Sequence, residues 1–232
     1  MWGAVRIGAA CTALLLAAAA ARPGGSPAAA AAEVCSAAIA AAAVERAHDV
    51  VEHLKSDRRD AAFAARLAQA EGALIAPAVG SSGPAVFLVR DGPAGEWSYP
   101  WFYAAEMPGL PAAGTAAVDA ALLVLNRSGV ERILDGGLEL KRDGPLTFVA
   151  PGPGVEGTLG MELLPDVMIF LSDPRADASG TRLSPLPACA EAYYGSPLSP
   201  SDVVPGKLPR LPAADRLRES LLALPPPRVL PR

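Results

Sequence analysis

The chain has 232 residues, which fits one domain with an additional tail, and 51% of them are hydrophobic. Its 24 prolines and 22 glycines predict many turns without reaching the composition of a disordered chain. The net charge of -4 is unevenly distributed, because residues 205–232 carry +4 and residues 1–32 carry two arginines, which leaves -10 on residues 33–204. An acidic body excludes nucleic acid as a partner and disfavours anionic bilayers.

Residues 1–32 have the pattern of a signal peptide. Arg6 precedes the uncharged run Ile7–Ala21, and the small residues of Ser26–Ala32 offer cleavage sites. The run has about 15 residues, whereas a membrane span needs roughly 20, so cleavage is favoured over a retained anchor. We therefore expect an exported protein, periplasmic or extracellular.

Cleavage after Ala32 would leave two cysteines, Cys35 and Cys189. Cysteines of exported proteins commonly pair, and this bridge would join the start of the first helix to the last strand region. Two buried free thiols are the alternative. CxxC spacing is absent from the sequence, so neither a zinc site nor a redox motif is suggested.

Two helices are expected next. Residues 34–54 carry apolar side chains at helical spacing, namely Ile39, Ala43, Ala47, Val50, Val51 and Leu54. After the charged break Lys55–Asp60, Asp60 predicts the start of a second helix and Gly72 predicts its end. The side chains expected to face inward are Ala61, Phe63, Ala64 and Leu67.

Short apolar runs then predict strands. Ala73–Val79 and Ala85–Arg90 flank a hairpin-like Gly80–Gly83 turn. The other expected strands are Glu96–Tyr103, Leu122–Asn126, Leu138–Arg142, Leu146–Ala150 and Val167–Ser172. Ser128 is expected to cap a short helix that ends at Gly136–Gly137. This order predicts an α+β fold, a single domain over residues 33–204 with N-terminal helices packed on a mostly antiparallel, strand-rich body.

The aromatic residues concentrate in Glu96–Tyr103. Four of them alternate and would share one strand face, with Phe102 on the other face and Pro100 at an edge or bulge. Trp and Tyr suit surfaces that are apolar on one side and hydrated on the other. The candidate lipid-binding residues are therefore Trp97, Tyr99, Trp101, Phe102 and Tyr103. Core packing is the alternative.

Residues 205–232 form a proline-rich, basic tail in which Ala213–Leu224 predicts a short amphipathic helix. Four cations are candidates for tethering the chain to anionic lipid or cell-wall polymer: Lys207, Arg210, Arg216 and Arg218. A solvated end is the alternative.

Catalytic and metal-binding motifs are weak. His48 and His53 would point roughly 140° apart on a helix, which predicts a solvated face with Asp49 and Glu52 as partners and no metal site. The literal GxGxxG at Gly152–Gly157 lacks a following helix and predicts a turn, so no cofactor is expected. An enzyme would need carboxylates to converge, for example those of Asp119, Glu131 and Asp166. We expect no enzymatic activity.

Three blocks in a fixed order carry a family resemblance: Leu67–Val79, Glu96–Tyr103 and Ala190–Val204. With Gly109–Leu110, Asp119 and Leu122–Asn126 between them, they resemble the SYLF family, a domain associated with lipid binding, in its bacterial secreted form. The resemblance spans about residues 60–204. Ala78–Ala85 lacks the basic residue that the family usually has there, and in Ser172–Gly180 a position that is basic in the family is acidic, which argues against a phosphoinositide headgroup.

The resemblance implies a non-enzymatic protein that binds lipid, a membrane surface or another apolar component of the cell envelope. The alternative is a structural or protein-interaction module of the envelope that does not bind lipid and whose partner is an envelope protein.

Overall fold

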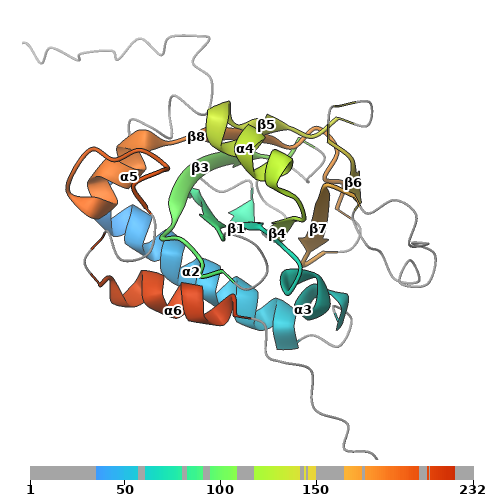
Figure 1. The fold of residues 1–232 in the computed structure, drawn as a ribbon, viewed down its shortest axis with the longest axis horizontal. Coiled ribbons are helices and arrows are strands. Elements are labelled where there is room, and N and C mark those ends of the chain that lie inside the picture. The colour runs from blue at the N-terminus through green and yellow to red at the C-terminus, as the bar shows by residue number, and fades with distance from the viewer. Residues whose placement is uncertain are drawn as a thin grey trace, which may run out of the picture.

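The computed structural model describes residues 35–56, 61–79, 83–90, 95–108, 118–141, 144, 146–149, 165–173, 176–203, 208 and 210–222. These residues form one mixed α+β domain around a curled sheet of eight strands (Figure 1), which confirms the predicted fold class. The expected signal peptide, the Gly152–Gly157 turn and the side chain of Lys207 lie outside the described residues.

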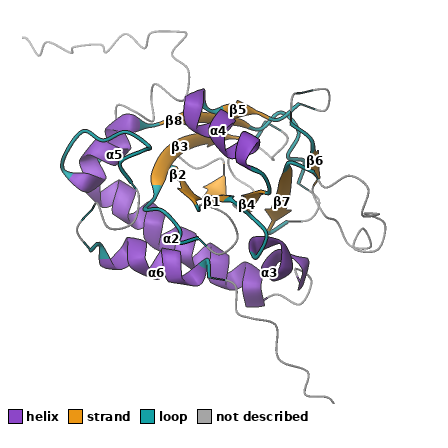
Figure 2. Cartoon of the chain, viewed as in Figure 1, coloured by secondary structure: helices purple, strands orange, loops and turns teal. Residues whose placement is uncertain are grey.

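Figure 2 separates the helices from the strands. The helices are α2 (Ala37–Ser56), α3 (Ala61–Leu67), α4 (Arg127–Gly136), α5 (Pro187–Tyr194) and α6 (Pro212–Ser220). The strands are β1 (Gly72–Val79), β2 (Ala85–Val89), β3 (Trp101–Glu106), β4 (Val118–Val124), β5 (Leu138–Glu139), β6 (Phe148–Val149), β7 (Val167–Leu171) and β8 (Arg182–Pro185).

Strand β1 lies inside the sheet, whose order is β5-β8-β3-β2-β1-β4-β7-β6. Its neighbours β2 and β4 are both antiparallel to it, and so are the pairs β2–β3, β3–β8, β5–β8 and β4–β7. Among the described strands, β6 and β7 form the one parallel pair. The sheet is therefore mostly antiparallel, as predicted, and β1 and β2 pair as a hairpin would, although residues 80–82 are not described.

One face of the sheet packs against helix α4. The register places Leu74 opposite Phe87 and Phe87 opposite Trp101, so these side chains share that face. The hydroxyl of Tyr103 on β3 donates a hydrogen bond to the Ile133 carbonyl of α4 at 2.9 Å. This bond ties α4 to the sheet.

The other face is covered by a layer of helices. Phe63 of α3 packs edge-on against Phe170 of β7, with ring centroids 5.1 Å apart. Phe102 of β3 contacts Tyr193 of α5 in the same manner at 5.3 Å. Helix α2 crosses β1, β2 and β4, and α6 lies beside α2 (Figure 1). Chain ends far apart in sequence thus meet in one helical layer.

Helix α2 buries the predicted apolar stripe, because every expected member is buried except Ile39, which is half-buried in the first turn. Helix α3 is shorter than predicted. It ends at Leu67, Ala64 is exposed, and Gly72 opens β1 instead of stopping the helix.

Arg90 explains where helix α3 ends. This residue is 4% exposed, and its guanidinium group donates hydrogen bonds to the carbonyl oxygens of Leu67, Ala68 and Ala70. The carbonyls at a helix C-terminus have no intrahelical partner, and here a side chain from β2's end supplies one.

The strand predicted at Glu96–Tyr103 is wrong in its first half, because β3 begins only at Trp101. Pro100 has no N–H to donate, and the N–H of Tyr99 bonds to the Val203 carbonyl at 2.8 Å instead of a neighbouring strand. The predicted alternation over one strand face therefore does not hold for this segment.

Asn126, not Ser128, caps helix α4, since its side-chain oxygen accepts from the N–H of Gly129 at 2.8 Å. The helix ends at Gly136 and Gly137, as predicted, and Gly137 takes a φ of 90°. Strand β8 and helix α5 were not predicted, although Pro187 in the first turn of α5 is a usual start signal.

A disulfide joins Cys35 to Cys189, with their Cα atoms 5.2 Å apart. It is the pairing suggested by the export signal and the cysteine count. Cys35 lies two residues before α2, and Cys189 lies in α5 and not in the strand region that was expected, so the bond ties together two helices of the same layer.

Candidate binding site beneath helix α6

The five aromatic side chains that were candidates for lipid contact are all buried. Trp97 is 1% exposed, Tyr99 and Trp101 are 4% exposed, and Phe102 and Tyr103 are inaccessible. The interpretation of this block as a membrane-inserting rim is therefore wrong, and the alternative, core packing, describes it. The reason is tertiary: α4, α5 and α6 cover the segment from both sides.

Trp97 lies between a buried cation and the end of helix α6. Its indole Nε1 donates a hydrogen bond to the Leu221 carbonyl at 3.1 Å. The guanidinium carbon of Arg90 lies 4.8 Å from the ring centroid, within the range of a cation–π contact. The Trp97 carbonyl accepts from Nε of Arg218 at 2.6 Å. The end of β2 and the C-terminal half of α6 therefore converge on this residue.

Tyr99 makes the next contact with α6. Its hydroxyl donates to Oδ1 of Asp215 at 3.2 Å, and the guanidinium carbon of Arg218 lies 4.7 Å from its ring centroid. Arg218 also bonds to Asp215 at 3.2 Å, so the aromatic ring, the carboxylate and the guanidinium form a compact polar group.

Helix α6 is part of the domain and not a solvated tail. The predicted amphipathic pattern is confirmed, since Ala214, Leu217 and Leu221 are inaccessible to solvent. The boundary drawn at residue 205 therefore does not separate an independent tail from the body, because this helix completes the layer that α2 begins.

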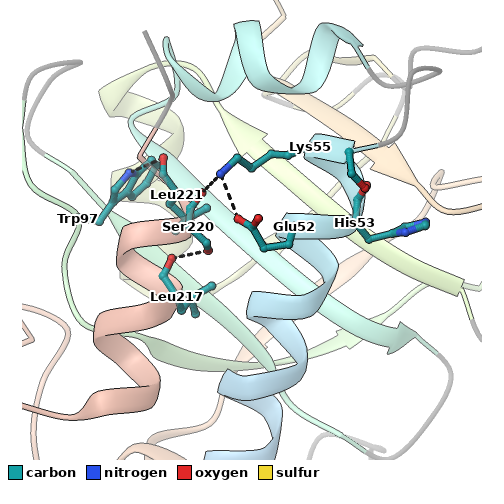
Figure 3. A network of polar contacts seen from close by, with 8 residues as sticks. Glu52, His53, Lys55, Trp97, Leu217, Ser220 and Leu221 are labelled. Carbon is teal, nitrogen blue, oxygen red and sulfur yellow. Dashed lines mark hydrogen bonds and ion pairs between the residues drawn. The ribbon is translucent and has the colours of Figure 1, made fainter.

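Polar contacts hold the C-terminal end of α6 against α2 (Figure 3). Nζ of Lys55 donates to the Ser220 carbonyl at 2.9 Å and to Glu52 at 3.0 Å. The hydroxyl of Ser220 donates to the Leu217 carbonyl at 2.7 Å. Lys55 thus supplies a donor to a carbonyl at a helix end, where no intrahelical N–H remains.

The four candidate tether cations have different environments. Arg216 is 53% exposed but forms an ion pair with Glu45 of α2, and Arg218 is engaged as described above. Arg210 is exposed and forms no hydrogen bond or ion pair with the residues that the structure describes. Lys207 lies outside the described residues.

A pocket of about 380 Å³ opens between α6 and the segment that precedes β3. We call it the α6 pocket; it is lined by Glu96, Trp97, Tyr99, Arg210, Asp215, Arg218, Glu219 and Leu222. Trp97 and Tyr99 are the buried members of this lining, 1% and 4% exposed, and we call these two residues its floor. The rest of the lining includes charged groups of both signs. Leu222 is 53% exposed and is the one large hydrophobic side chain that is exposed among the described residues.

Half of this lining was predicted. Trp97, Tyr99, Arg210 and Arg218 were candidate site residues, in two sets that were assigned to separate roles. The carboxylates of Glu96, Asp215 and Glu219 were not predicted. The i,i+3 spacing of Asp215 and Arg218 on a predicted helix was an available signal for one of them.

Burial raises the pKa of all four tyrosines of the chain. The pKa of Tyr193 rises to about 12, mainly through desolvation. For Tyr99, desolvation comes first and the hydrogen bond to Asp215 adds to it.

We therefore predict that the tyrosines of the folded protein ionise at higher pH than those of the unfolded chain. A raised pKa means that the folded state favours the protonated phenol. The contribution of these phenols to the free energy of unfolding is therefore complete below about pH 10 and is lost as the pH rises towards 12. Ultraviolet absorbance should show a tyrosinate titration centred near pH 10 in concentrated urea and a titration shifted to higher pH in the folded protein. One tyrosine titrating near pH 10 in the folded protein would contradict this burial.

The carboxylates that an enzyme would need do not converge. Asp119 lies at the start of β4 and its Oδ1 accepts from the N–H of Ala78 at 2.8 Å. Asp166 lies beside the other end of β4, about 17 Å along a strand, and binds Asn126 and Thr147. Glu131 is exposed on α4 and forms an ion pair with Arg127, one turn away, at 3.3 Å.

The two histidines also have different environments. His53 is exposed, whereas His48 is half-buried and its Nδ1 has no hydrogen-bond partner among the described residues. The solvated face predicted for both is therefore wrong for His48, and Glu52 binds Lys55 instead. In the described part of the chain, no cluster of three metal-ligating side chains occurs, and no helix is long and apolar enough to cross a membrane.

Comparisons with known proteins find no family model that matches the chain and no curated protein that matches it.

Proposed function

We propose that this chain is an exported, non-enzymatic module of the bacterial cell envelope, similar to SYLF proteins, that binds lipid at the α6 pocket. The observation that carries the proposal is a convergence. Two aromatic residues of the block that resembles the SYLF family, Trp97 and Tyr99, line the same pocket as two cations of the C-terminal region, Arg210 and Arg218.

The chemistry of the lining suits an amphiphile. Leu222 offers an exposed apolar surface, and covering the accessible part of such a side chain contributes about 1 kcal/mol. Arg210 offers a guanidinium group that can bind a phosphate with two parallel hydrogen bonds. An apolar wall next to a cation is what a lipid requires at the junction of its headgroup and acyl chains.

The mode of contact differs from the one that the aromatic block suggested. Trp97 and Tyr99 are held by the Leu221 carbonyl and by Asp215, so their rings form a fixed floor and do not insert into a bilayer. Under this proposal the lipid headgroup enters the pocket of the protein. Trp101, Phe102 and Tyr103 then act only as the core that supports the floor.

Vesicle flotation tests this proposal with the chain from Glu33 to Arg232, which contains every described residue and lacks the apolar N-terminal run. We expect flotation of this protein and a reduction of about fivefold in its affinity for Leu222→Asp, because the charge opposes burial of that wall. Ala64→Asp, at an exposed position on α3 outside the pocket, is the matched control. Removal of residues 205–232 is not a clean test, since it deletes α6.

Absence of binding to every vesicle would overturn lipid binding. Recovery of an envelope protein by the same chain, without dependence on lipid, would then favour the interaction module over the lipid-binding module. Equal effects of Leu222→Asp and Ala64→Asp would place the lipid contact outside the α6 pocket.

A further inference from the structure

We infer that the α6 pocket selects a zwitterionic headgroup, in which one phosphate is joined to a primary ammonium group, over headgroups with a net negative charge. The inference rests on the proposed function, since it names the lipid class for the same pocket.

The charge balance of the pocket carries the first step. Two guanidinium groups, of Arg210 and Arg218, face three carboxylates, of Glu96, Asp215 and Glu219, so the lining has a net charge of -1. A headgroup with several phosphates would bring like charges against these carboxylates, which is unfavourable in a partly enclosed site. A headgroup with one positive and one negative group meets an opposite charge at both ends.

The cationic side has room for one phosphate. Arg218 already uses Nε on the Trp97 carbonyl at 2.6 Å, Nη1 on Asp215 at 3.2 Å and Nη2 on Glu96 at 3.4 Å. Its guanidinium also lies over the ring of Tyr99. Arg210 has no such partners among the described residues and is exposed at the pocket. It is therefore the group that binds the phosphate.

The anionic side is available to an ammonium group. The side chain of Glu96 is 77% exposed and holds Arg218 only at 3.4 Å. The carboxylate of Glu219 is exposed and forms no hydrogen bond or ion pair with the described residues. A primary ammonium has three N–H donors, which carboxylates accept well. Glu219, which shares the pocket lining with Glu96, is therefore the acceptor that we expect.

The aromatic floor favours a primary over a quaternary ammonium. Recognition of a quaternary ammonium depends on open aromatic faces. Here a guanidinium already covers each ring of the floor, Arg90 at 4.8 Å from Trp97 and Arg218 at 4.7 Å from Tyr99. The ammonium is therefore recognised through hydrogen bonds to carboxylates, which a choline group cannot donate.

Vesicle affinity of the Glu33–Arg232 chain tests the selection. The probes are vesicles of phosphatidylcholine alone and equal mixtures of it with phosphatidylethanolamine or with phosphatidylglycerol. We expect the ethanolamine mixture to bind about three- to fivefold more tightly than either of the others, as partly exposed ion pairs allow. Glu219→Gln should remove this preference, and Arg210→Gln should weaken binding to all three. Glu191→Gln and Arg46→Gln, both exposed and outside the pocket, are the matched controls.

The outcomes separate the two proposals. Binding to none of the vesicles overturns the proposed function. Binding that is equal for the three vesicles or strongest for phosphatidylglycerol, or that keeps its ethanolamine preference in Glu219→Gln, overturns the selection and leaves lipid binding in place. Soluble glycerophosphoethanolamine should compete weakly, because it has no acyl chains to cover Leu222. Competition as strong as that of the vesicles would overturn the lipid as the source of the headgroup.

Discussion

Loss of the Cys35–Cys189 disulfide is expected to destabilise the protein by up to about 5 kcal/mol. The bond closes a loop with a sequence separation of 154, and a cross-link of this length removes much conformational entropy from the unfolded chain. The measurement is urea unfolding followed by circular dichroism, for the native protein, for the Cys35→Ala/Cys189→Ala double variant, and for both with reductant.

Reductant should lower the unfolding midpoint of the native protein to about that of the double variant and leave the double variant unchanged. The folded state itself should keep its sheet, because the bond joins two helices of one layer and no strand depends on it. Hydrogen exchange should increase first in the initial turns of α2 and in α5. A native protein whose midpoint is insensitive to reductant would contradict the role given to the bond.

The second large effect is expected at Trp97. Trp97→Ala should destabilise the protein by about 3–5 kcal/mol, since it removes a fully buried indole. It also uncovers the buried guanidinium of Arg90 and frees the Leu221 carbonyl at the end of α6. Urea unfolding gives the loss of stability, and hydrogen exchange should report faster opening of α6 than of the sheet.

A pair of phenylalanine variants separates ring packing from hydrogen bonding. Trp97→Phe loses the bond from Nε1 to Leu221, worth about 1 kcal/mol, whereas Nε1 of Trp101 has no partner among the described residues. We therefore expect Trp97→Phe to lower stability more than Trp101→Phe does. A larger loss for Trp101→Phe, or an α6 that opens no faster in Trp97→Ala, would contradict this account of how α6 is held.

Local sequence patterns predicted those features that depend on neighbouring residues. The apolar stripe of α2 repeats at helical spacing, and the short apolar runs of β1, β2, β7 and the second half of β4 are bounded by turn residues or by caps, although β4 begins at Val118 and not at Leu122. The amphipathic pattern of α6 was likewise visible in the sequence. These elements and the α+β class followed, because secondary structure of this kind reflects the periodicity of the chain itself.

The errors occur where distant residues decide the local structure. The helix expected to run to Gly72 ends at Leu67 because Arg90, from the end of β2, binds its carbonyls. The strand expected from Glu96 starts at Trp101 because the N–H of Tyr99 donates its hydrogen bond to the Val203 carbonyl and not to a neighbouring strand. Neither partner is near in sequence, and no periodicity in the segment itself encodes it.

The sequence by itself determined most of the element types, the two cysteines that pair, and half of the residues that line the candidate site. Only the tertiary structure decided that the aromatic block is buried and that helix α6 covers part of it. The physical reason is that an alternation of Trp and Tyr is equally compatible with a surface between water and an apolar phase and with a protein core. Burial of Trp97 and Tyr99 depends on α6, more than a hundred residues later, and on the hydrogen bonds that hold it there.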